Sequence, residues 1–285
     1  MRWLLAALAL GTLAPAAGGA AAPRIVSLAP NLTELAYAAG AGSTLVGTVE
    51  YSDYPAAARA LPRVGDAWRV DPERVLELRP DLVLAWSSGT PGDTVARLES
   101  LGLKVVSIPT YRLADVATAL RTIGKIAGTS AVAEASAEAF DSGIRRLRAV
   151  HTGVPKLSVF IEIDDEPLYT VNGRHVISEV VELCGGRNVF AELPQLAPPV
   201  ALEAVLALDP QVILSTDDTI ADPQALWRRW TQLAAVRDGA IYSMSSDTLT
   251  RATPRLADGA REVCAALDDA RAKRAARIAR AARAP

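Results

Sequence analysis

An internal repeat constrains the fold of this chain more than any other feature. Residues 73–85, Glu-Arg-Val-Leu-Glu-Leu-Arg-Pro-Asp-Leu-Val-Leu-Ala, match residues 203–215, Glu-Ala-Val-Leu-Ala-Leu-Asp-Pro-Gln-Val-Ile-Leu-Ser, at an offset of 130 positions. Each copy predicts a short helix that is stopped by proline and followed by a buried strand. A second match pairs Thr-Glu-Leu at 33–35 with Ser-Glu-Val at 178–180. We therefore expect two similar α/β lobes with a ligand cleft between them.

Short apolar runs alternate with helical patterns along the whole chain, which indicates βαβ units and parallel sheets. Several runs show little polar alternation, as expected for strands covered on both faces. The Ala-, Glu- and Arg-rich segment that starts at Ser130 lacks proline and predicts one long helix between the lobes. The expected strands are 24–28, 44–49, 82–85, 104–108, 157–161, 212–215 and 240–243.

The first 22 residues have the pattern of a secretory signal peptide. Arg2 precedes the apolar run Trp3–Leu10, and small residues fill positions 16–22. The alternative is a membrane anchor, but the strongly apolar stretch stops near Leu13, short of the roughly 20 residues that a bilayer crossing needs. With no cysteine in or just after the segment, we expect a soluble exported chain without a lipid anchor. The expected organisation is a signal peptide at 1–22, an N-terminal lobe at 23–129, a linking helix at 130–152, a C-terminal lobe at 153–268 and a basic tail at 269–285.

Composition narrows the class of function. The chain has 30 Lys+Arg and 32 Asp+Glu, a net charge of −2, so nothing predicts nucleic-acid binding. Alanine accounts for 54 of the 285 residues, so the 50% hydrophobic share does not indicate a polytopic membrane protein. Residues 271–285 hold six basic residues and no acid, which predicts a solvated helix extension or a frayed end, with contact to anionic lipid as the alternative. Residues 23–270 carry a net charge of −9.

Aromatic residues cluster where strands end. Ligands of open parallel sheets bind beyond the carboxyl ends of the strands. Tyr51, Trp86 and Tyr111 each follow an expected strand, and Trp68 lies in a loop before a helix. We expect Trp68 and Trp86 to line the ligand site, whereas Tyr51 and Tyr111 fit equally well as covers of their own cores.

The second half offers polar groups at the equivalent positions. Tyr169 lies in the loop Asp165–Thr170, and Asp247 and Arg251 follow the strand that ends near Ser243. A carboxylate and a planar guanidinium suit a polar, amide-rich ligand. A local ion pair at a spacing of four residues is the alternative.

Motifs for catalysis and for metal binding are missing from the sequence. There is no Gly-x-Ser-x-Gly, no Walker loop and no Gly-x-Gly-x-x-Gly after the first strand. His151 and His175 do not share a metal-ligand spacing, and the acidic clusters at 164–166 and 217–218 are explained as exposed turns. We expect no catalytic residues, no metal site and no cofactor.

Five segments resemble the periplasmic cobalamin (vitamin B12)-binding proteins of ATP-driven importers. The resemblance covers residues 24–267. Its Pro-x-x-Thr-Glu motif is shared with haem and siderophore binders, whereas Tyr-Ser-Asp-Tyr-Pro together with Trp68 and Trp86 is more specific to the cobalamin branch. The segments are Arg-Ile-Val-Ser-Leu-Ala-Pro-Asn-Leu-Thr-Glu-Leu at 24–35, Tyr-Ser-Asp-Tyr-Pro at 51–55, Leu-Ala-Trp at 84–86, Val-Glu-Leu-Cys-Gly-Gly-Arg-Asn at 181–188 and Arg-Ala-Thr-Pro-Arg at 251–255.

The resemblance implies two Rossmann-like lobes with mostly parallel sheets, joined by one long helix, that hold cobalamin in the cleft for delivery to an ABC transporter. This sequence departs from the family pattern near residues 195–199, where the family can present a Trp, and at 247–250, which lack the aromatic and acidic residues of relatives. Haem or ferric-siderophore capture is the alternative within the class, and an exported enzyme is the alternative from another class. The ligand contacts that carry over are Tyr51, Trp68, Trp86, Tyr169, Asp247 and Arg251.

Two glutamates also carry over, as contacts to the transporter. Glu73 and Glu203 hold matching places in the repeat, each in the first turn of an expected helix, where the helix dipole alone favours an acid. The duplication is expected to put one carboxylate on each lobe, facing arginines of the permease, while the acidic body helps steering. The protein is expected to act as a monomer in the periplasm.

The two cysteines lie in one lobe. Cys184 follows an expected helix over 176–183, and Cys264 lies in the C-terminal helical pattern. An oxidising compartment favours a disulfide between them, and two buried free thiols are the alternative.

Overall fold

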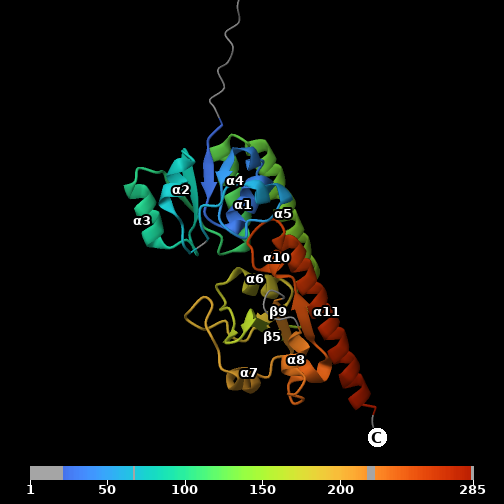
Figure 1. The fold of residues 1–285 in the computed structure, drawn as a ribbon. Helices are drawn as coiled ribbons and strands as arrows, with labels where there is room; N and C mark the ends of the chain where they lie inside the picture. The colour runs from blue at the N-terminus through green and yellow to red at the C-terminus, as the bar shows by residue number, and fades with distance from the viewer. Residues whose placement is uncertain (1–21, 67, 217–221, 284–285) are drawn as a thin grey trace, which may run out of the picture.

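Two parallel sheets form the framework, one in each lobe (Figure 1). The computed structural model describes residues 22–66, 68–216 and 222–283. The N-terminal sheet has the order β2-β1-β3-β4, and the C-terminal sheet, read from its opposite edge, has the order β8-β5-β9-β10. Counted along the chain within each sheet, both orders are 2-1-3-4, so the topology repeats as the sequence does. The strands are β1 Ile25–Ser27, β2 Leu45–Gly47, β3 Leu82–Trp86, β4 Val105–Ile108, β5 Leu157–Glu162, β8 Gly186–Asn188, β9 Val212–Thr216 and β10 Ile241–Met244.

The repeated segments fold as the sequence predicts. In the first copy, α2 (Pro72–Glu77) ends before Pro80 and leads into β3. In the second copy, α7 (Leu202–Leu208) ends before Pro210 and leads into β9. The third strand of each sheet therefore comes from the repeat. All seven expected strands are present. The strand β8 and the antiparallel hairpin of β6 (Asp164–Asp165) and β7 (Leu168–Tyr169) were not expected from the sequence.

Helices cover both faces of each sheet, which explains the unbroken apolar strands. One face of the N-terminal sheet packs on α1 (Pro30–Ala38) and α4 (Leu113–Ala127), and the other on α2 and α3 (Gly92–Ser100). In the C-terminal lobe, α6 (Val176–Leu183) and α11 (Leu256–Ala281) cover one face. The other face packs on α7, α8 (Pro223–Trp227) and α9 (Ala234–Asp238). The remaining short helices are η1 (Gly42–Thr44), η2 (Ala56–Ala60) and α10 (Ser246–Leu249).

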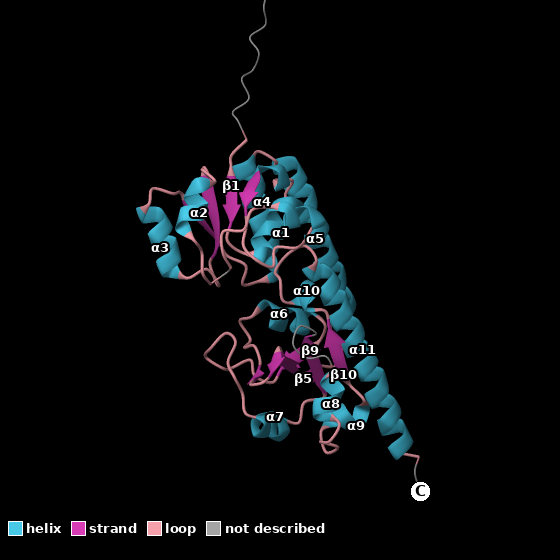
Figure 2. Ribbon diagram, viewed as in Figure 1, coloured by secondary structure: helices cyan, strands magenta, loops and turns pink. Residues whose placement is uncertain are grey.

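Two long helices run along one side of the molecule and join the lobes (Figure 2). The expected linking helix is α5 (Ser130–His151), which packs against α4 and α11. One continuous buried cluster extends from Ile25 in β1 to Ala270 in α11, so the lobes share a core. The basic tail forms the end of α11, where Arg271 donates to the carbonyl oxygen of Cys184 at 2.7 Å and Arg277 pairs with Asp238.

The expected disulfide is confirmed. Cys184, directly after α6, is bonded to Cys264 in α11, with their Cα atoms 4.7 Å apart. The expected signal peptide falls almost wholly on residues 1–21, outside the described residues. Within the described ranges, no helix combines the length and the apolar character that a membrane crossing requires.

Candidate ligand-binding cleft

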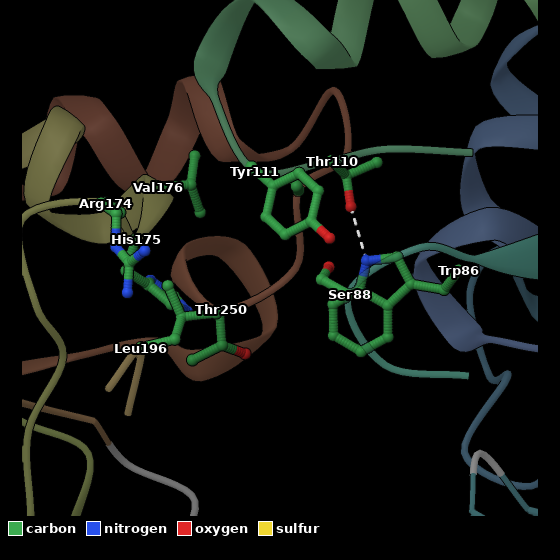
Figure 3. Close-up of a pocket in the computed structure, with 10 residues that line it drawn as sticks. Trp86, Ser88, Thr110, Tyr111, Arg174, His175, Val176, Leu196 and Thr250 are labelled. Atoms are coloured by element: carbon green, nitrogen blue, oxygen red, sulfur yellow. Dashed lines mark hydrogen bonds between the residues drawn. The ribbon is translucent and has the colours of Figure 1, made fainter. Parts of the chain in front are cut away.

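A cavity of about 70 Å³ lies between the lobes, where chain segments beyond the carboxyl ends of the two sheets meet (Figure 3). One wall comes from the ends of β3 and β4, and the other from the start of α6 and the segment after α10. Ligand sites of open parallel sheets are found at this edge. The lining residues are Trp86, Ser88, Thr110, Tyr111, Arg174, His175, Val176, Leu196, Thr250 and Ala252.

Trp86 and Tyr111 give the N-terminal wall its aromatic character. The Trp86 Nε1–H donates to the Thr110 hydroxyl oxygen at 2.7 Å, and the Tyr111 hydroxyl donates to the carbonyl oxygen of Ser87 at 3.1 Å. A Cβ atom at Gly89 would lie 1.9 Å from the indole, so glycine is needed there for the ring to fold over its own turn. Both rings are therefore held in place on this wall of the cavity. The structure places both Trp86 and Tyr111 at the cavity; for Tyr111 the sequence left two interpretations open.

Tyr51 and Trp68 lie on two neighbouring loops of the same lobe. The loops are joined by a hydrogen bond of 2.8 Å from the Glu50 N–H to the carbonyl oxygen of Gly65, and Asp66 accepts from the Trp68 N–H at 2.7 Å. Both rings are highly exposed, 77% for Tyr51 and 71% for Trp68, so neither covers a core. Tyr51 has a φ of 63°, a conformation that is uncommon for a bulky residue. Neither ring lines the cavity itself.

A buried hydroxyl cluster explains the Pro-x-x-Thr-Glu motif. The Thr33 hydroxyl in α1 lies 2.6 Å from that of Thr48, which donates to Ser52 at 2.8 Å. All three residues are buried. The cluster fastens the loop that carries Tyr51 to the first helix, so the motif positions that loop.

The motif glutamate joins the lobes. Glu34, only 3% exposed, accepts from Arg251 at 3.0 Å and from Arg255 at 2.7 Å. Arg251 also contacts Asp53 at 3.0 Å, and Asp247 at 3.6 Å. The local pair predicted as an alternative for Asp247 and Arg251 exists, but it belongs to a larger network between α1 and the segment after α10.

Asp53 and the two arginines of this network stabilise each other's charged forms. Burial alone would raise the pKa of Asp53, but the hydrogen bond and the charge of Arg251 outweigh it and hold the pKa below its usual value. Burial alone would lower the pKa of both arginines, and their carboxylate partners raise it instead. The Arg255 guanidinium also stacks on the Tyr54 ring at 4.1 Å. Arg251 is thus largely committed to protein carboxylates, whereas the Asp247 side chain stays 56% exposed.

The C-terminal wall differs from the sequence expectation. Tyr169 lies on β7, partly exposed and paired with Pro199, and does not line the cavity. Arg174 and His175 line it instead. His175 shares no metal-ligand spacing with His151, so no motif marked it in the sequence; its place directly before a helical pattern was the available signal.

Glu73 and Glu203 lie away from the cavity. Each is exposed in the first turn of its helix, and α2 and α7 lie on the side of the lobes remote from α5 and α11 (Figure 1). Among the described residues, no cluster of His, Cys, Asp and Glu is arranged to hold a metal ion. The acidic pair at 217–218 lies outside the described residues.

Comparison with known proteins gives consistent matches over most of the chain. The family model "Periplasmic binding protein" matches residues 25–248. The vitamin B12-binding protein of Vibrio cholerae is 36% identical over 244 residues, which cover 85% of this chain and 88% of that protein. The crystal structure of periplasmic vitamin B12-binding protein of Vibrio cholerae superposes with a TM-score of 0.83, covering 88% of this chain and 98% of that one. A periplasmic haem-binding protein of Pseudomonas aeruginosa is 27% identical, with a TM-score of 0.74 over 86% of this chain and 92% of that one.

Proposed function

The chain belongs to the periplasmic binding protein family, and from that premise we propose that it captures cobalamin, a corrinoid, in the cleft between its lobes and delivers it to an ABC transporter of the inner membrane. The observation that carries this proposal is the 36% identity to a vitamin B12-binding protein over 85% of the chain. The cleft supports it, because aromatic rings lie on one wall and the polar side chains of Arg174 and His175 on the other.

The chemistry of a corrinoid suits such a cleft. The periphery of the flat corrin ring carries apolar groups, which can contact Trp86 and Tyr111. It also carries carboxamides, which need both hydrogen-bond donors and acceptors. The exposed Tyr51 and Trp68 extend the aromatic surface along the N-terminal rim, and Asp247 offers a carboxylate to amide N–H groups. Holding the ligand needs no bond making or breaking, so the proposed activity is binding without catalysis.

Haem or ferric-siderophore capture is the second candidate, and the likeness to a haem-binding protein favours it. A haem propionate or a siderophore carboxylate requires a free cation. Arg251 already faces Glu34 and Asp53 at 3.0 Å each. Arg251 is therefore unavailable for that contact, and Arg174, which lines the cavity, is the cation that could meet such a carboxylate.

We assign docking on the transporter to the two glutamates of the repeat. Glu73 and Glu203 are exposed at matching helix starts, one on each lobe, as a two-fold pair of permease arginines would require. In this proposal the protein acts as a monomer in the periplasm after its signal peptide is removed.

The test is titration of the purified mature chain with cyanocobalamin and, separately, with haemin. We expect saturable quenching of tryptophan fluorescence by cyanocobalamin and corrinoid absorption bands in protein isolated from a supplemented culture. Haemin should give no saturable change in its absorption spectrum. Saturable haemin binding without cyanocobalamin binding would replace the corrinoid proposal with the haem alternative.

A further inference from the structure

His175 sits on the C-terminal wall of the cavity with its protonation state fixed by the fold. It is the N-cap of α6, and its Nδ1 accepts a hydrogen bond of 3.2 Å from the Ile177 N–H. A ring nitrogen that accepts carries a lone pair, so the proton of the neutral imidazole is on Nε2. Burial lowers the pKa of His175 to about 4, which keeps the ring neutral at the pH of a living cell.

The Nε2–H group has no protein acceptor within the described part of the chain. The ring lines the cavity across from Trp86 and Tyr111 (Figure 3). A donor in a cleft is satisfied either by water or by a ligand, and a ligand acceptor gains from a site already aligned for it.

The turn that carries His175 is rigid. The buried Asn172 accepts from the Arg174 N–H at 2.9 Å and donates to the carbonyl oxygen of Leu193 at 2.9 Å. The Ser178 hydroxyl donates to the carbonyl oxygen of Asn172 at 2.7 Å. The imidazole is therefore preorganised, and little side-chain entropy is lost when a ligand meets it.

We propose that His175 is a ligand-positioning residue whose Nε2–H donates a hydrogen bond to the carbonyl oxygen of a carboxamide on the rim of the corrinoid. The assignment rests on the proposed function, since it presumes an amide-bearing ligand. Capping does not require histidine at this position, because serine, threonine, asparagine and aspartate are the preferred caps. The imidazole adds a donor that reaches into the cleft.

The same geometry argues against metal ligation by His175. A ligating histidine commonly donates its other N–H to an acceptor. Coordination through Nε2 would move the proton to Nδ1, where it would face the Ile177 N–H and break the cap. His175 is thus set to hold an amide oxygen rather than the cobalt or iron of a ligand.

Two variants separate this role from a structural one. His175→Ser keeps a capping oxygen, but its hydroxyl is too short to replace the Nε2–H that reaches into the cleft, so the Kd for cyanocobalamin should rise about 5-fold while the melting temperature stays the same. His175→Gln keeps a donor amide and is a poorer cap, so it should retain more of the affinity while melting lower. Nitrogen-15 spectra of the imidazoles should show the Nε2–H form for the signal that disappears in His175→Ser.

The outcomes are distinct. A wild-type protein that binds no corrinoid overturns the proposed function and this role with it. Wild-type binding with an unchanged Kd in His175→Ser overturns the role of His175 alone. An Nδ1–H tautomer in the free protein overturns the assignment of the donor, whatever the affinities.

Discussion

Trp86 is the side chain on which corrinoid binding should depend most. Its indole forms the N-terminal wall and is held by Thr110. Trp86→Ala should weaken cyanocobalamin binding by about 1 to 3 kcal/mol, the usual value of a lost aromatic platform. Trp86→Phe keeps a ring and loses the Nε1–H, so its affinity for cyanocobalamin should lie between those of the wild type and of Trp86→Ala. Fluorescence or calorimetric titration measures both, and unchanged affinity in Trp86→Ala and in Trp68→Ala would refute the site.

Glu162 should make stability depend on pH. It ends β5, is fully buried, and accepts from the Trp227 Nε1–H at 3.1 Å. Burial raises its pKa to about 7, against about 4.3 in an unfolded chain. Between these values the folded state holds a proton that the unfolded state has lost, so the free energy of unfolding falls as pH rises through this window, by about 4 kcal/mol.

Glu162→Gln should remove that slope, and Glu192→Gln, at an exposed glutamate of the same lobe, should leave it intact. Denaturant melts at pH 5, 6, 7 and 8 provide the comparison. A Glu162→Gln protein with the wild-type slope would show that another group titrates.

Sequence reasoning found some of these side chains and missed others for physical reasons. Trp86 was predictable because the end of a buried strand is a fixed place in a parallel sheet. The contact between Arg251 and Glu34 joins residues 217 positions apart, and no local pattern encodes such a distance. His175 acts alone, so no spacing revealed it.

Among the helices and strands, those with a clear apolar pattern could be predicted from the sequence. Strands such as β3 and β9 are apolar runs, and their burial on two faces is visible in the sequence. The strand β8 is Gly-Arg-Asn, which has no β preference of its own. It pairs with β5 because α6, which precedes it directly, packs against it and holds it at the sheet edge. Tertiary packing, not propensity, makes this strand.

The disulfide between the end of α6 and α11 should contribute much of the stability of the C-terminal lobe. It closes a separation of 80 residues, for which the loop-entropy model gives about 4 kcal/mol. The Cys184→Ala, Cys264→Ala double variant should lose about that much in denaturant melts, and reduced wild-type protein should melt with it. Two reactive thiols in the unfolded, unreduced protein would show that the bond does not form.

The shared core and the network around Glu34 hold the two lobes together. Arg255→Met leaves the buried Glu34 with fewer partners and should cost about 2 to 3 kcal/mol in denaturant melts. Adding Glu34→Gln should recover part of the loss, since the uncompensated charge disappears. A double variant as unstable as the sum of the two single variants would show that the pair is not coupled.

Docking should be separable from binding. Glu73→Ala and Glu203→Ala should leave the Kd for cyanocobalamin unchanged, because both residues lie outside the cavity. Each should weaken association with the transporter, and the double variant more so, with reduced sensitivity to salt. Glu99→Ala, at another exposed glutamate, is the matched control. The measurement is association of each variant with the transporter in proteoliposomes. Normal association of the double variant would show that the two glutamates only stabilise the starts of their helices.

The shared core has a consequence for the proposed delivery of ligand to the transporter. Domains with a large apolar contact move little against each other, so an empty molecule should offer α2 and α7 at nearly the same separation as a loaded one. If a permease binds those helices, as proposed, it receives no signal from them that a ligand is bound. Ligand-free protein should compete with ligand-bound protein for the same transporter. Import should therefore slow when the binding protein is in excess over its ligand.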